Sequence, residues 1–285
     1  MPLHSPYMSG MNELLRHIRA CNNAILPGSR LPGSRLPVLL GAERVGWVLP
    51  DLAQRAADHG AALGPDGLRI PAYALAKLAR ALASAGAFRW RDEAFDVRAR
   101  QGGPALAQID RGALPAFGIQ ATGVHVNGLV GDQIWVGYRA ADKALDPNKL
   151  DHLVAGGIPA GYTPEQTLAK EGKEEAGLPA TLAAQARFVA TIEYAMERAE
   201  GLRRDVLHCY DLELPPDFRP EPQDGEVSHF ELWSLERALD TVRRTDDVKF
   251  NVNLVLIDLF IRRGLVTGDE AAALRAALTT PNQEE

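Results

Sequence analysis

Three glutamates are the residues of this sequence whose type and spacing could do chemistry. Glu171, Glu174 and Glu175 stand at positions i, i+3 and i+4, a spacing that brings side chains to one face of a helix. Adjacent like charges repel by roughly 0.2 to 0.5 kcal/mol, and a half-buried cluster therefore needs a counter-charge. A magnesium ion is suitable, because it prefers oxygen ligands and retains several waters beside a diphosphate. The alternative is a solvated face on which Lys170 and Lys173 are partial partners of the glutamates.

The flanking residues predict a helix with defined ends that follows an anion-binding loop. Thr163 and Gln166 have the spacing of a capping box, and Gly177 can end the helix in a left-handed conformation. The glycines within 156–161 predict a loop whose backbone N–H groups approach anionic oxygens. An ordinary turn between a strand and a helix is the alternative for that loop.

Loop, helix and final glycine together resemble the Nudix box, G-x(5)-E-x(7)-R-E-U-x-E-E-x-G-U, in which U is a bulky aliphatic residue. The residues that match box positions are Gly156, Glu171, Glu174, Glu175, Gly177 and Leu178. Three positions depart from the box, because Lys170 replaces the arginine, Tyr162 the first glutamate and Gly172 an aliphatic residue. Lysine keeps the charge without the planar fork of arginine, and glycine weakens a helix by roughly 0.5 to 1 kcal/mol. None of these changes removes a metal ligand of the box.

The resemblance implies a magnesium-dependent pyrophosphohydrolase in which Mn²⁺ can replace Mg²⁺. The metal ligands that it implies are Glu171, Glu174, Glu175 and Gly156. The catalytic residues that it implies are Glu171, Glu174 and Glu226. Either Glu171 or Glu226 would remove the proton from a metal-activated water that attacks phosphorus. Glu226 follows a turn at the start of a predicted strand, so a surface glutamate is the alternative for it.

The resemblance also implies three contacts to the substrate. They are assigned to Gly157 in the loop, Lys170 in the helix and Arg139 at the end of the predicted strand 134–139. For Arg139, a solvated surface arginine is the alternative.

Two further segments narrow the resemblance to one subgroup. Residues 210–215 and 224–227 are similar to the Nudix subgroup that occurs fused to thiamine pyrophosphokinase in some fungi. In that subgroup a domain of unknown function, about as long as residues 1–115, precedes the Nudix domain. The similarity implies thiamine diphosphate or its oxidised analogues as the substrate, cleaved to the monophosphate and phosphate.

The elements that must position these residues predict an α/β (α+β) protein of two domains. A smaller N-terminal α/β domain over 1–115 is expected to precede a Nudix domain over 116–285, an α/β/α sandwich with a mixed sheet. Helices are predicted at 12–20, 51–60, 71–85, 164–176, 235–244, 250–263 and 269–278. Strands are predicted at 44–49, 88–97, 119–127, 134–139, 186–194, 205–214 and 226–233. A five-residue sequence repeated at 26–30 and 31–35 predicts an exposed loop.

The composition is that of a globular chain. Of the 285 residues, 46% are hydrophobic and 24% charged, which suffices for a sizeable core. The net charge of −6 gives no general attraction to nucleic acid or anionic lipid. Neither a signal peptide nor a membrane span is expected, so the expected location is the cytoplasm. Cys21 and Cys209 are expected to be ordinary buried or half-buried thiols, and a homodimer is compatible with the sequence.

Two other functions would use the same fold. A non-catalytic Nudix-like binding or sensor module would recognise a nucleotide-like ligand without cleaving it, and loss of the acidic cluster would have indicated that function. An isomerase of a prenyl diphosphate is the other alternative. Neither would release phosphate, so phosphate release distinguishes a hydrolase from both.

Overall fold

The computed structural model describes residues 6–24, 35–142, 146–223 and 225–279. Its helices are α1 (Pro6–Cys21), α2 (Pro50–Asp58), α3 (Leu75–Ser84), α4 (Pro164–Ala176), α5 (Ala180–Ala183), α6 (Leu235–Arg244), α7 (Val252–Arg262) and α8 (Gly268–Thr279), with 3-10 helices η1 (Ala72–Ala74) and η2 (Arg111–Ala113). Its strands are β1 (Leu36–Leu40), β2 (Glu43–Val48), β3 (Ala62–Gly64), β4 (Gly67–Ile70), β5 (Ala94–Val97), β6 (Ala107–Asp110), β7 (Gln120–Val130), β8 (Gln133–Arg139), β9 (Leu150–Asp151), β10 (Val154–Gly157), β11 (Arg187–Arg198), β12 (Gly201–Glu213) and β13 (Val227–Ser234). Apart from Arg35, the predicted repeat loop lies outside the described residues.

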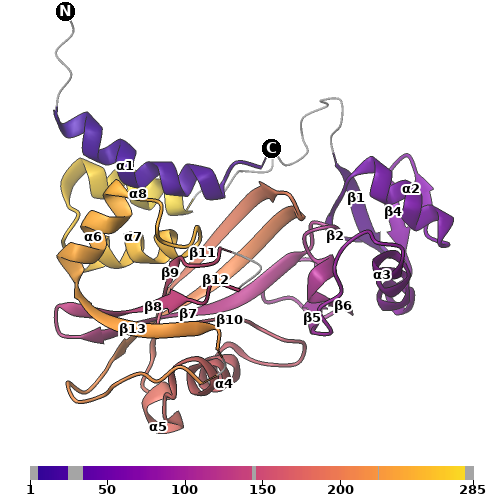
Figure 1. The fold of residues 1–285 in the computed structure, drawn as a ribbon. Coiled ribbons are helices and arrows are strands. Elements are labelled where there is room, and N and C mark those ends of the chain that lie inside the picture. The colour runs from indigo at the N-terminus through magenta and orange to yellow at the C-terminus, as the bar shows by residue number, and fades with distance from the viewer. Residues whose placement is uncertain (1–5, 25–34, 143–145, 224, 280–285) are drawn as a thin grey trace, which may run out of the picture.

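A seven-stranded mixed sheet forms the centre of the molecule (Figure 1). Its strands follow the order β11-β12-β7-β8-β13, with β10 beside β7 and β9 beside β8. Strands β12 and β7 are parallel, and the other neighbours are antiparallel. Helices α4 and α5 cover one face, whereas α1, α6, α7 and α8 lie on the other. The predicted α/β/α sandwich with a mixed sheet is confirmed.

Each face of the sheet has its own apolar core. Beneath α4, Leu168 and Ala176 pack with Val124 and Val126 of β7, which alternate with residues of the opposite face. On that opposite face, 9 of the 11 residues of α7 are buried. A helix that is apolar all round must be enclosed, and α7 lies between the sheet and the other three helices.

Residues 35–113 form a smaller lobe beside the sheet, which we call the N-terminal lobe (Figure 1). A four-stranded sheet, β2-β1-β4-β3, packs with α2 and α3, and the hairpin β5–β6 lies next to them. The core of the lobe continues into Phe117 and Ile119, directly before β7. The lobe therefore joins the central sheet through packed residues, not through an extended linker.

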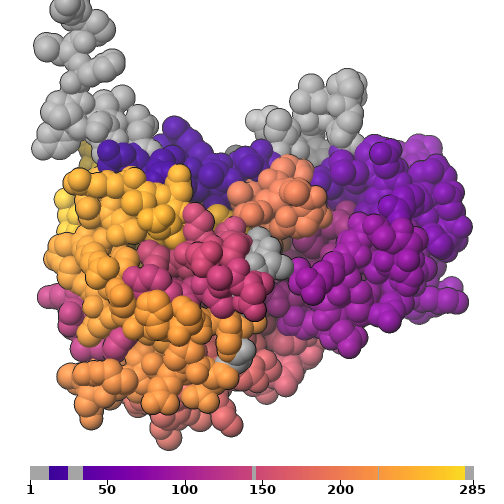
Figure 2. Space-filling view, viewed as in Figure 1, coloured from indigo at the N-terminus to yellow at the C-terminus, as the bar shows by residue number. Residues whose placement is uncertain are grey.

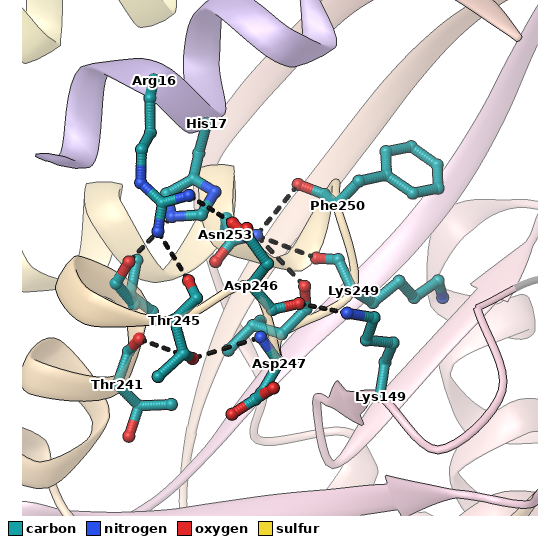
Figure 3. A network of polar contacts seen from close by, with 12 residues as sticks. Arg16, His17, Lys149, Thr241, Thr245, Asp246, Asp247, Lys249, Phe250 and Asn253 are labelled. Atoms are coloured by element: carbon teal, nitrogen blue, oxygen red, sulfur yellow. Dashed lines mark hydrogen bonds and ion pairs between the residues drawn. The ribbon is translucent and has the colours of Figure 1, made fainter.

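Helix α1 precedes this lobe in the sequence but packs on the C-terminal helices. Leu14 and Ile18 lie in the core formed with α6, α7 and α8. Arg16 forms an ion pair with Asp246 and donates a hydrogen bond to the Thr245 carbonyl at 2.6 Å (Figure 3). The division at residue 115 stays a prediction, and the structure adds that the first helix crosses it.

Several short elements differ from those predicted. The predicted strand 88–97 is extended only in β5, because the residues before it turn back onto β6. Strands β1, β3, β4, β6, β9 and β10 were not predicted, since segments of five residues or fewer carry little periodicity. Cys21 and Cys209 are buried free thiols, as expected. No helix within the described ranges is long and apolar enough to cross a membrane.

Candidate active site

Helix α4 forms with the ends that the sequence predicts. The Thr163 hydroxyl accepts a hydrogen bond from the Gln166 N–H at 3.2 Å, and the Gln166 side chain accepts one from the Thr163 N–H at 2.9 Å. Gly177 follows the helix with φ 62°, a left-handed conformation that glycine adopts at little cost. The capping box and the glycine end are confirmed, and they fix where the three glutamates fall along the helix.

The first two glycines of the predicted loop lie in a strand, which corrects that part of the prediction. Gly156 and Gly157 belong to β10 and pair with β7. A Cβ on Gly156 would lie 2.4 Å from Cγ of Glu171, so only glycine lets this glutamate lie against the strand. Gly161, with φ 80°, makes the turn that leads to the helix.

Glu175 points from α4 toward the sheet and is 7% exposed. Its carboxylate accepts a hydrogen bond from the Ala155 N–H at 2.9 Å. Burial raises the pKa of Glu175 well above its ordinary value; the Ala155 N–H opposes this rise, and the charges of Asp151, Glu171 and Glu226 add to it. The charge of Glu226 thus acts on Glu175 of the box, and the carboxylates together leave an excess of negative charge.

Lys170 links the other two glutamates of the helix. Its Nζ donates to Glu171 at 3.0 Å and to Glu174 at 2.7 Å. Burial lowers the pKa of Lys170, but the hydrogen bonds to Glu174 and Glu171 outweigh it, so the net shift is upward. The lysine is therefore charged at neutral pH and offsets part of the negative charge.

The carboxylates fit a divalent metal ion by their chemistry and their charge. In the part of the chain that the structure describes, no group of three or more His, Cys, Asp or Glu side chains is already gathered as a ligand set. Hydrogen bonds from Lys170 and from the backbone hold the carboxylate oxygens instead. The donors are hard oxygens in excess over positive charge, which is the environment that Mg²⁺ and Mn²⁺ prefer. Glu171, Glu174 and Glu175 are the residues that would hold the ion.

Two of the residues that depart from the box differ in burial, since one packs in the interior and the other faces solvent. A Cβ on Gly172 would lie 3.0 Å from Cδ2 of Leu178, and the Leu178 N–H donates to the Gly172 carbonyl at 2.9 Å. The glycine therefore leaves room for the buried leucine to pack against the helix. Tyr162 is 47% exposed, so a glutamate at this position would face solvent.

Arg139 lies in a buried ion cluster. Its guanidinium donates to Asp151 at 2.8 Å and to the Asp146 carbonyl at 3.0 Å. Lys249 contacts the same Asp151 oxygen at 3.0 Å. The structure shows neither an open phosphate contact nor a solvated arginine, and a substrate role for Arg139 stays a prediction that requires this ion pair to open.

The N-terminal lobe reaches the box through its β5–β6 hairpin. The Ala94 carbonyl accepts a hydrogen bond from the Ala160 N–H at 2.8 Å. A Cβ on Gly157 would lie 2.6 Å from Cζ of Phe95, so the ring covers this glycine. Figure 2 shows the lobe, in purple, seated against the rest of the molecule. The substrate contact predicted for Gly157 stays a prediction. It would require the Phe95 ring, which packs on this glycine, to leave the backbone accessible.

The charge of Glu93, a residue of the N-terminal lobe, also acts on Glu171 of the site. Burial raises the pKa of Glu171, Lys170 opposes that rise, and the charges of Glu174 and Glu93 add to it. No local pattern could have identified Glu93, because its proximity to the box arises from tertiary packing between segments far apart in the sequence.

Comparison with known families accounts for most of the described chain. Residues 121–253 match the NUDIX domain, and residues 72–121 match a domain of unknown function, DUF4743. The chain therefore carries a Nudix domain preceded by a DUF4743 domain, and the resemblance carried by the box is confirmed.

Two curated relatives from Arabidopsis thaliana and one solved structure are similar to this chain. Nudix hydrolase 24, chloroplastic, is 43% identical over 180 residues, which cover 62% of this chain and 49% of the relative. Nudix hydrolase 20, chloroplastic, is 39% identical over 188 residues, which cover 65% of this chain and 50% of the relative. The chain thus spans about half the length of these relatives. The MutT protein from Methanosarcina mazei Go1 has a TM-score of 0.40 and 14% identity, and the alignment covers 51% of this chain and 95% of that one.

Proposed function

We propose that the protein is a Mg²⁺- or Mn²⁺-dependent hydrolase that cleaves the diphosphate linkage of a small molecule. The observation that carries the proposal is the acidic face of α4 against β10. There Glu175 is buried, Glu171 lies against Gly156, and Glu174 and Glu226 add their charges. The presence of a Nudix domain and of relatives named Nudix hydrolases supports hydrolysis at this site.

In this proposal the residues of the chain hold a metal ion and move a proton. The proposed ligands are Glu171, Glu174, Glu175 and the carbonyl of Gly156. A bound divalent ion supplies charge neutralisation to the diphosphate and lowers the pKa of a bound water. Glu226 or Glu171 accepts the proton of the attacking water. Lys170, once released from the glutamates, contacts a phosphate oxygen.

For the substrate, the proposal names thiamine diphosphate or its oxidised analogues, cleaved to the monophosphate and phosphate. Its support is the similarity of residues 210–215 and 224–227 to the thiamine-linked Nudix subgroup. The DUF4743 match adds to this support, since it lies where that subgroup carries its N-terminal domain. The cytoplasmic location stays a prediction, and the two relatives are named chloroplastic.

A phosphate-release screen of the full chain tests the proposal. The compounds are thiamine diphosphate, an oxidised thiamine diphosphate, a dinucleoside diphosphate and a prenyl diphosphate, each with and without Mg²⁺. We expect Mg²⁺-dependent release, fastest on the thiamine compounds. Binding without release would indicate a sensor module, and a rearranged prenyl diphosphate without release would indicate an isomerase.

A further inference from the structure

A turn of the N-terminal lobe is built rigidly next to the acidic face. Asp110 is buried and accepts hydrogen bonds from three backbone N–H groups, those of Arg91 at 2.9 Å, Glu93 at 3.2 Å and Gly112 at 2.8 Å. Within the turn, Asp92 has φ 60°, a left-handed conformation that is uncommon outside glycine. Such backbone persists only where its surroundings hold it, and it is concentrated at functional sites.

Arg111 follows Asp110 and is tied to the same turn. Its guanidinium donates to the Glu93 carboxylate at 2.9 Å, and its backbone N–H donates to the Glu93 carbonyl at 2.8 Å. The guanidinium carbon lies 5.9 Å from the centre of the Phe95 ring, which covers Gly157 of the box. Contacts thus connect Arg111 to the box through Phe95, and the charge of its partner Glu93 contributes to the raised pKa of Glu171.

The basic side chains around the site differ in how free they are to meet a substrate. The side chain of Arg139 is 10% exposed and held by Asp151. Lys170 is 38% exposed and bridges two glutamates of its own helix. Arg111 is 52% exposed and paired with Glu93, which is 33% exposed. Of these three cations, Arg111 is the most accessible to an anion that arrives from solvent.

We propose that Arg111 binds a phosphate group of the diphosphate substrate and that Glu93 is the positioning residue that holds it ready. The inference rests on the proposed function, whose site it extends. A guanidinium matches phosphate with two parallel hydrogen bonds, and a bound diphosphate offers more negative charge than one carboxylate. Because Glu93 orders the side chain beforehand, less conformational entropy is lost on binding. The N-terminal lobe thereby supplies a substrate contact that the Nudix box lacks.

Calorimetric titration with methylenediphosphonate, a diphosphate analogue that resists hydrolysis, tests the contact directly in the presence of Mg²⁺. We expect the full chain to bind this probe and Arg111→Ala to bind it at least about tenfold more weakly. Arg111→Lys should recover part of the loss, because lysine keeps the charge without the fork. Arg69→Ala is the matched control, since Arg69 is an exposed arginine of the same lobe paired with Asp66 at 3.3 Å.

Steady-state kinetics on thiamine diphosphate separate binding from a purely structural role. If Arg111 contacts the substrate equally in the bound state and in the transition state, losing the contact affects binding alone. Arg111→Ala should then raise KM by at least about tenfold and leave kcat within about threefold. A brace for the box would instead lower kcat and the melting temperature while KM stays near the wild-type value. That second pattern would overturn the proposal.

The role of Glu93 is tested by combining variants. Glu93→Gln should weaken binding of methylenediphosphonate about two- to fivefold in the wild-type background and cause no further loss in Arg111→Ala, since positioning requires the arginine. Unchanged affinity in Arg111→Ala would overturn the inference. Binding of the probe without phosphate release from any compound would contradict the hydrolase and leave the Arg111 contact standing. Failure of the full chain to bind the probe would contradict both.

Discussion

Two groups of charged residues differ in whether their buried carboxylates are offset by positive charges. In one group, Asp151 is held between Arg139 at 2.8 Å and Lys249 at 3.0 Å. Burial alone raises the pKa of Asp151, but Lys249 and Arg139 outweigh it and bring it far below its usual range. In the other group, on α4, burial and neighbouring carboxylates raise the pKa of Glu175.

The contrast distinguishes a structural cluster from a binding site. The Asp151 cluster carries its own counter-charges and needs nothing from outside the protein. The glutamates of α4 outnumber its two lysines, which disfavours the folded state unless a cation is bound. Ionisable groups held in such unfavourable surroundings are concentrated at functional sites.

The largest effect is expected from breaking the balanced cluster. Asp151→Ala leaves Arg139 and Lys249 buried without their shared carboxylate, so the free energy of unfolding should fall by roughly 3 to 5 kcal/mol. Urea unfolding measures the loss, and Asp66→Ala, which removes an exposed ion pair, should cost less than about 1 kcal/mol. An equally small loss for Asp151→Ala would show that the cluster is not a balanced structural unit.

Acid should weaken the same region, because two histidines are buried beside Asp151. Nδ1 of His125 and Nδ1 of His152 lie 3.0 Å apart. Burial lowers the pKa of His152 to about 4 and that of His125 well below its ordinary value. The unfolded chain binds these protons near pH 6.5 and the folded chain does not, so stability is present above that pH and is lost as pH falls toward 4.

The size of this effect can be checked by urea unfolding between pH 7.5 and 4.5. His152 alone should account for about 3 kcal/mol across the window. His152→Gln should flatten the pH dependence, whereas the exposed His59→Gln should leave it unchanged. Stability that stays constant between pH 7 and 5 would contradict the neutral, buried pair.

Glu175→Gln tests the other group, because it should lower kcat without lowering the free energy of unfolding. We expect kcat to fall by at least about 10²-fold, or about 2.7 kcal/mol in the barrier. Stability should hold or rise, since a crowded buried charge is removed. Glu165→Gln, on the first turn of the same helix, is the matched control. Wild-type rates in Glu175→Gln would mean that the acidic face is merely a charged surface.

The smallest effect on activity is expected when a carboxylate is added just before α4, the helix that carries the glutamates. Tyr162→Glu restores the usual box residue, but the position is exposed and, on this account, does not hold the metal. Activity should rise by no more than about tenfold, roughly 1.4 kcal/mol. A much larger gain in kcat/KM would show that the site is a weakened one.

The sequence predicts best what local chemistry decides. Thr163, Gln166 and Gly177 set the ends of α4 through contacts within a few residues, so the helix and its acidic face follow from the sequence. The Nudix box then identified the fold, because its glycines and glutamates stand at fixed spacings that match the family.

Contacts between segments far apart in the sequence could not be predicted from these local patterns. The periodicity of α1 predicts an apolar face without saying that it packs on the C-terminal helices. Arg139 has the same local sequence whether it meets a phosphate or Asp151. Glu93 and Arg111 lie in short segments, and tertiary contacts such as the packing of Phe95 on Gly157 and the hydrogen bond from Ala160 to Ala94 connect their hairpin to the box.

Divalent-ion binding tests the central claim most directly, namely that the excess negative charge on α4 is a metal site. Electron paramagnetic resonance of Mn²⁺ titrated into the full chain at neutral pH reports binding without requiring turnover. We expect the wild type and Glu165→Gln to bind Mn²⁺ and Glu175→Gln to bind it at least about tenfold more weakly. Chelation should abolish phosphate release, and Mg²⁺ or Mn²⁺ should restore it. Equal Mn²⁺ binding by the wild type and Glu175→Gln, or full turnover in excess chelator, would contradict the account.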